Sequence, residues 1–147
     1  MDRLKYGPIA AKLAKQQKDY LIANSRLEHL DANGDAFAVR AQDAGLFKAG
    51  EIMAAVYTLG SYNLDVDQAY VSWKQSPHHY SEIINTIYNC IGWADGFYPE
   101  TVTSIITGAG QYIPETGTYT TEETSVDIPE EMLGKLRLFV VVFSNEQ

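Results

Sequence analysis

Apolar positions recur at helical spacing in the first part of the chain. Ile9, Leu13 and Tyr20 fall near one stripe, and the lysines between them point elsewhere. Pro8 suits the first turn of a helix, where the N–H groups have no partners within the helix anyway. The pattern predicts an amphipathic helix over residues 9–23.

Turn-forming residues separate this helix from a second one. The sequence Asp31-Ala-Asn-Gly34 has turn chemistry, because Asn-Gly tolerates positive φ. We expect Asp35 to cap a helix that runs to about Ala44, with Gly45 ending it.

Two further helices are predicted before residue 85. Asp65 or Asp67 begins one that runs to about Gln75. Its inner face should carry Ala69, Tyr70 and Trp73. Ser76-Pro77 then begins a short helix that presents residues 78–84.

Apolar runs predict the strands. Residues 87–93 form one such run. Residues 135–144 alternate at first and then become continuously apolar, which is typical of a central strand buried on both faces under helices. The threonine-rich sequence within 95–134 predicts an exposed hairpin or a mobile loop. That segment is too long for a plain connection.

Length and charge narrow the function classes. A chain of 147 residues has the size of a single domain, here 1–147. Its net charge of −8 argues against nucleic-acid binding, which needs clustered Lys and Arg. No Lys or Arg lies between Gln75 and Gly134, whereas nine acids do. This acidic stretch is either a solvated face or a surface for a basic partner or a cation.

Cys90 is the single cysteine, so no disulfide can form within the chain. Its apolar neighbours favour a buried thiol over a nucleophile. No stretch resembles a signal peptide, and no window approaches the ~18 apolar residues of a membrane span. The sequence therefore predicts a soluble protein, for which secretion would require a leader.

A specific motif occupies residues 73–92. Nine positions match, without a gap, the central signature of microbial domains of the CAP superfamily, the group that includes cysteine-rich secretory and pathogenesis-related proteins. The matching residues are Trp73, Ser76, Pro77, His79, Ile83, Asn85, Tyr88, Ile91 and Gly92. The chain therefore resembles the SCP-like branch of this superfamily.

Weaker matches flank the motif in the family's order. Leu27-Glu-His29 resembles its Ser-His-Thr turn, and Gly50-Glu51-Ile resembles its Gly-Glu-Asn. The resemblance implies an α/β fold, a three-layer α-β-α sandwich. The family's usual first helix should precede Leu4 and is missing, and the segment at about 94–134 is an insert without a family counterpart.

The resemblance also implies a pocket built from His29, Glu51 and His79, with Ser76 beside it. Two imidazoles and a carboxylate suit Zn²⁺ with a fourth position left open, and they also suit acid–base chemistry. The same three residues can instead form a purely structural hydrogen-bonded network. For Arg40 we expect an ion pair with a nearby acid, such as Asp35 or Asp43, rather than an anion contact at the pocket rim.

Three functions remain open. The first is a non-enzymatic CAP-type module for binding or structure, with a protein partner or a homo-oligomer, because no activated nucleophile is evident and Ser76 is explained by helix capping. The second is a zinc-dependent hydrolase or small-ligand binder that uses the pocket. The third is a cell-wall hydrolase, since residues 98–114 resemble a segment of spore cortex-lytic enzymes, although the catalytic Glu of those enzymes has no counterpart upstream.

Overall fold

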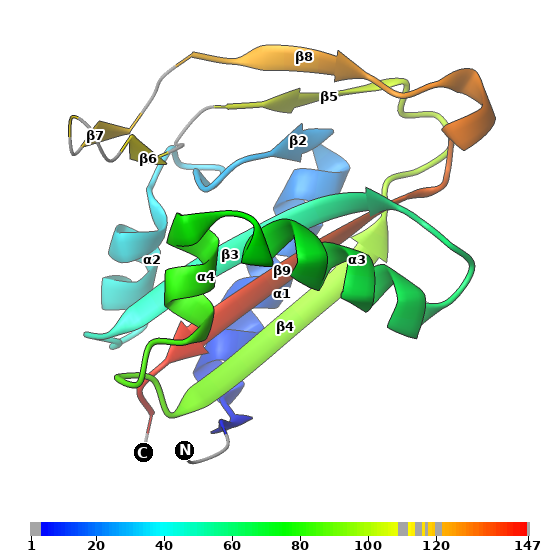
Figure 1. Cartoon of the computed structure of the whole chain (residues 1–147). Helices are drawn as coiled ribbons and strands as arrows, with labels where there is room; N and C mark the ends of the chain where they lie inside the picture. The colour runs from blue at the N-terminus through cyan, green and yellow to red at the C-terminus, as the bar shows by residue number, and fades with distance from the viewer. Residues whose placement is uncertain (1–3, 109–111, 114–115, 117, 120–121, 147) are drawn as a thin grey trace.

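The computed structural model describes residues 4–108, 112–113, 116, 118–119 and 122–146, and it shows a mixed α/β fold (Figure 1). The helices are α1 (Pro8–Ala23), α2 (Phe37–Asp43), α3 (Tyr62–Lys74), α4 (Pro77–Ile83) and the 3₁₀ turn η1 (Glu130–Met132). The strands are β1 (Lys5–Tyr6), β2 (Arg26–Leu27), β3 (Ala49–Tyr57), β4 (Cys90–Phe97), β5 (Ser104–Thr107), β6 (Tyr112–Ile113), β7 (Thr118–Tyr119), β8 (Thr124–Asp127) and β9 (Leu136–Ser144).

The main sheet has the strand order β1-β4-β9-β3. β9 lies between β4 and β3 and is antiparallel to both, whereas β1 pairs with β4 in parallel. Leu138, Val140 and Val142 of β9 are fully buried. The prediction of a central buried strand at the end of the chain is therefore confirmed.

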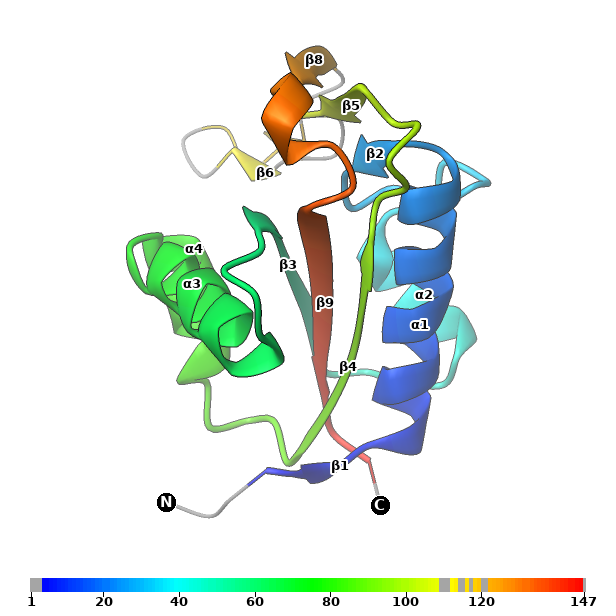
Figure 2. The ribbon, with the colours of Figure 1, turned by 90° about the vertical axis from the view of Figure 1, so that its right-hand side faces the viewer.

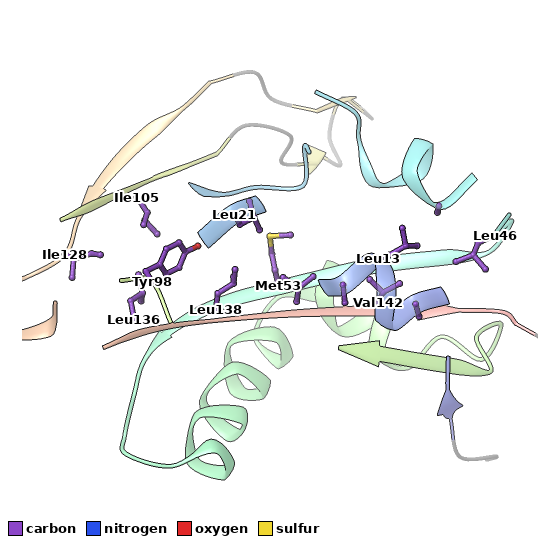
Figure 3. Close-up of a cluster of buried hydrophobic side chains, with 14 residues drawn as sticks. Leu13, Leu21, Leu46, Met53, Tyr98, Ile105, Ile128, Leu136, Leu138 and Val142 are labelled. Atoms are coloured by element: carbon purple, nitrogen blue, oxygen red, sulfur yellow. The ribbon is translucent and has the colours of Figure 1, made fainter. Parts of the chain in front are cut away.

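Helices cover both faces of the main sheet. α1 and α2 lie on one side, and α3 and α4 lie on the other (Figure 2). On the first side, Leu13 and Leu21 of α1 belong to the same buried cluster as Met53 and Leu138 (Figure 3). On the second side, Trp73 of α3 belongs to a separate buried cluster that includes strand residues. The two clusters fix the helices against the two faces of the sheet.

A second sheet, of order β2-β5-β8, lies at the end of the main sheet where β9 begins (Figure 1). Tyr98, Ile105 and Ile128 pack beneath it and extend the α1-side core (Figure 3). The Tyr98 hydroxyl donates a hydrogen bond of 2.5 Å to the Arg26 carbonyl of β2. The segment 94–134 thus supplies two strands of a sheet, although parts of its threonine-rich stretch lie outside the described residues.

Three details of the helices differ from the predictions. α3 begins earlier than expected, because the Ser61 side chain accepts from the Leu64 N–H and caps the helix. Tyr70 is 43% exposed rather than on the inner face. Asp35 does not cap α2, which has Ala36 at its N-cap; instead the Asp31 side chain accepts from the N–H groups of the following turn.

β4 begins at Cys90, three residues later than predicted, because Asn85 and Asn145 hold the preceding loop. The Ile87 N–H donates to the Asn85 side chain, and the Asn145 amide donates to the Ile87 carbonyl. Cys90 is buried, as expected. Within the described part of the chain, no helix is both long and apolar enough to cross a bilayer.

Candidate functional site

The predicted pocket residues meet around one cavity of about 280 Å³ at an end of β3. α2 and α4 lie on opposite faces of the sheet (Figure 2), and both lie near the start of β3 (Figure 1). His29 comes from the loop after β2, Glu51 from β3, and Ser76 and His79 from the start of α4. The other lining residues are Phe37, Ala38, Ala49, Gly50, His78 and Glu82. Residues as distant in sequence as His29 and His79 therefore form one site.

The Glu51 carboxylate is the most buried polar group of the site, with 1% of the side chain exposed. Its Oε1 lies 2.9 Å from His29 Nδ1 and 3.0 Å from Arg40 Nη2, and its Oε2 accepts from Arg40 Nη1 at 3.1 Å. A carboxylate paired with a guanidinium is ionised and only accepts, so Nδ1 of His29 carries the proton. Both oxygens of Glu51 are consequently engaged within the protein.

The ion pair expected for Arg40 is present, but its partner is Glu51 and not Asp35 or Asp43. Sequence neighbours suggested those partners, but α2 turns the Arg40 side chain toward β3. Arg40 Nη2 also donates to the His29 carbonyl at 2.8 Å, and the guanidinium lies 5.1 Å from the centre of the Phe37 ring. Arg40 thus joins α2, β3 and the loop that carries His29.

His79 stands on α4 across the cavity from this group. Burial lowers the pKa of His79 below its ordinary value, and the positive charges that His29 and His78 can carry lower the pKa further. The His79 imidazole is therefore neutral at neutral pH. A neutral imidazole presents one hydrogen-bond donor and one acceptor.

Glu82 also lines the cavity, and the sequence analysis did not select it. Its Oε2 accepts a hydrogen bond of 2.6 Å from the Tyr88 hydroxyl. Burial raises the pKa of Tyr88, and the hydrogen bond to Glu82 raises the pKa further. A Cβ at Gly50 would overlap the Glu82 carboxylate and the Tyr88 hydroxyl, so both side-chain ends lie close to the backbone of β3. The sequence could have indicated Glu82, because it follows His79 by three positions and the two residues therefore share one face of a helix.

Ser76 lines the cavity and occupies the N-cap position of α4, but its side chain makes no capping hydrogen bond. The expected capping role is therefore positional only: Ser76 is extended and allows Pro77 to begin the helix. No activated nucleophile is evident among the described residues that line the cavity, because the Glu51 carboxylate is engaged elsewhere and Ser76 has no hydrogen bond to either imidazole.

A metal centre was the second chemistry expected here. Among the residues that the structure describes, no group of three or more His, Cys, Asp or Glu side chains is arranged to hold a metal ion. The carboxylate that zinc would need, that of Glu51, already faces the Arg40 guanidinium. The arrangement thus favours hydrogen bonding over metal ligation.

Comparisons with known proteins show the fold. An outer surface protein from Borrelia burgdorferi superposes with a TM-score of 0.61 over 100% of this chain and 80% of its own, with 17% sequence identity. No model of a protein family matches the chain, and no curated protein matches its sequence. At this level of identity, the likeness shows a shared α/β fold and nothing about activity.

Proposed function

We propose that this chain is a non-enzymatic binding module of the CAP type, a three-layer α-β-α sandwich whose His29–Glu51–His79 cavity receives a small ligand without converting it. One observation carries the proposal: Glu51, the acid at the centre of the site, has both oxygens bonded to Arg40 and His29. The acid is thus used to build the pocket rather than to react.

General-base catalysis by Glu51 would need an oxygen free to take a proton from water or substrate. Ser76 lacks a neighbouring base at hydrogen-bond distance, so it is not activated as a nucleophile either. The cavity nevertheless keeps three imidazoles and a second carboxylate, Glu82, at its walls, which suits the binding of a polar ligand.

The zinc-dependent hydrolase is the alternative for the same cavity. It rests on the chemistry of the imidazoles and carboxylates that line the cavity. It requires Glu51 to exchange Arg40 for a metal ion, and the loss of a buried ion pair makes that exchange costly. No observation of this kind favours the cell-wall hydrolase.

The test uses a variant that fills the cavity. Ala38 is exposed on α2 and lines the cavity, whereas its neighbour Val39 is exposed and does not line it. Ala38→Phe should therefore block binding, and Val39→Phe is the matched control on the same helix. Ligand-observed NMR with a mixture of small cations, anions and neutral polar molecules measures binding, and spectra after prolonged incubation show whether any ligand is converted.

The proposal predicts ligands that bind the wild type and Val39→Phe, lose binding in Ala38→Phe, and stay chemically unchanged. The absence of any ligand with this behaviour overturns it. Conversion of a bound molecule that requires added Zn²⁺ and stops in Glu51→Gln would establish the hydrolase instead.

A further inference from the structure

The charges around the cavity are not balanced. Two carboxylates line it, those of Glu51 and Glu82, and none of the described lining residues is Lys or Arg. Arg40 neutralises Glu51 from behind the cavity wall. Within the described part of the chain, Glu82 forms no ion pair, and the Tyr88 hydroxyl that it accepts from is neutral. The cavity therefore keeps one carboxylate charge without a counter-charge.

The remaining polar groups of the cavity can each accept a hydrogen bond. Because Nδ1 of His29 donates to Glu51, Nε2 is the acceptor of a neutral His29 ring. His78 and His79 add two further imidazoles, and the Ser76 hydroxyl adds oxygen lone pairs. A ligand that donates several hydrogen bonds and carries positive charge complements such a set.

Part of the cavity wall is apolar. Phe37, Ala38 and Ala49 line it, next to the polar groups. A cavity of about 280 Å³ admits a molecule of a few heavy atoms, with room for a short alkyl chain beside the polar end. The shape thus suits an amphipathic molecule with one charged end.

From this arrangement we infer that the cavity binds small organic ammonium ions, with Glu82 as the anchor for the charge, the imidazoles of His29 and His79 as hydrogen-bond acceptors, and the apolar wall around the alkyl part. This inference rests on the proposed binding function. A carboxylate or phosphate ligand would meet the Glu82 carboxylate and find no Lys or Arg on the cavity wall. A metal ion would find no described group of three ligating side chains.

Butylammonium chloride, sodium butyrate and butanol serve as probes, because they share the alkyl chain and differ in charge. The dissociation constant of each follows from NMR titration of the His29 and His79 ring signals in the full chain. Glu82→Gln removes the charge and keeps an oxygen that accepts from Tyr88. Glu131→Gln, an exposed acid in η1, is the control for a general loss of negative charge.

Butylammonium should bind at least about tenfold more tightly than butyrate or butanol, and Glu82→Gln should weaken it about tenfold, because a charge-assisted hydrogen bond is lost. Glu131→Gln should bind as the wild type does. Equal or tighter binding of butyrate, or butylammonium binding unchanged in Glu82→Gln, overturns the inference. If other ligands bind in a manner sensitive to Ala38→Phe while butylammonium does not, the binding function stands and the ammonium inference fails.

Discussion

At the scale of single residues, the site depends on a pair that the sequence could not reveal. Arg40 and Glu51 are 11 positions apart, and they meet only because α2 folds back onto β3. The acids close to Arg40 in sequence, Asp35 and Asp43, were the obvious partners and are not used. His29, Glu51 and His79 could be selected through family resemblance, whereas residue spacing alone gave no reason to bring them together.

Arg40→Met should lower the free energy of unfolding by about 3–5 kcal/mol, because it leaves the Glu51 carboxylate buried without its counter-charge. Urea denaturation followed by circular dichroism measures the change. The double variant Arg40→Met, Glu51→Leu should recover part of the loss, since both charges are then removed together.

Lys15→Met provides the comparison, because Lys15 forms an exposed ion pair with Asp19 on α1. Its cost should stay below about 1 kcal/mol. If Arg40→Met cost no more than Lys15→Met, the buried pair would not hold the pocket together, and the proposal would lose its central observation.

At the scale of elements, hydrophobic periodicity predicted those helices and strands whose position depends on residues close in sequence. α1, α4 and β9 lie where the pattern put them, because proline, amphipathic spacing and a continuous apolar run act over a few residues. The pattern failed for the start of α3, where Ser61 and the two later aspartates compete as caps. It also gave no hint of how closely α1 approaches β4, which depends on the absence of a side chain at Gly92.

Two glycines on the same face of β4 test that approach. A Cβ at Gly92 would overlap the backbone of Ala10 and Ala11 in α1, so Gly92→Ala must push the helix away from the sheet. A Cβ at Gly96 would meet only the flexible ends of side chains, with Ile22 Cδ1 nearest at 2.8 Å. Gly92→Ala should cost about 1–3 kcal/mol, and Gly96→Ala less than about 0.5 kcal/mol. Urea denaturation of the two glycine variants measures this difference. Equal midpoints for Gly92→Ala and Gly96→Ala would refute the close contact between α1 and β4.

At the scale of the whole molecule, the sequence predicted an α/β fold with a central buried strand, and it missed the second sheet. β2, β5 and β8 come from distant segments, and their short strands show too little alternation to be assigned. Long-range contacts, such as the ion pair between Arg26 and Glu123, hold this sheet and cannot be inferred from local pattern. The expected protein partner or homo-oligomer stays a prediction, because a single chain contains no contact that tests it.

A second buried ionic network joins three elements around the main sheet. Asp65 of α3 is fully buried and accepts from Thr58 Oγ1 at 2.6 Å, from the Leu59 N–H at 2.7 Å and from Arg137 Nη1 at 3.1 Å. Arg137 of β9 also pairs with Asp95 of β4. Burial by itself would raise the pKa of Asp65, but the three hydrogen bonds outweigh it and lower the pKa below its ordinary value.

This lowered pKa makes the molecule sensitive to acid. Because the folded-state pKa of Asp65 lies below the unfolded value of about 3.9, its contribution is present above about pH 4 and is lost as the pH falls through the folded pKa. Asp65→Asn should cost about 1–3 kcal/mol at pH 7, since the amide cannot replace the charged acceptor. The difference in the free energy of unfolding between the wild type and Asp65→Asn, measured by urea denaturation, should narrow steadily from pH 4 downward. Asp67→Asn changes an exposed acid on the same helix and should show no such narrowing. If the difference between the wild type and Asp65→Asn stayed constant with pH, the charge of the Asp65 carboxylate would not stabilise the fold.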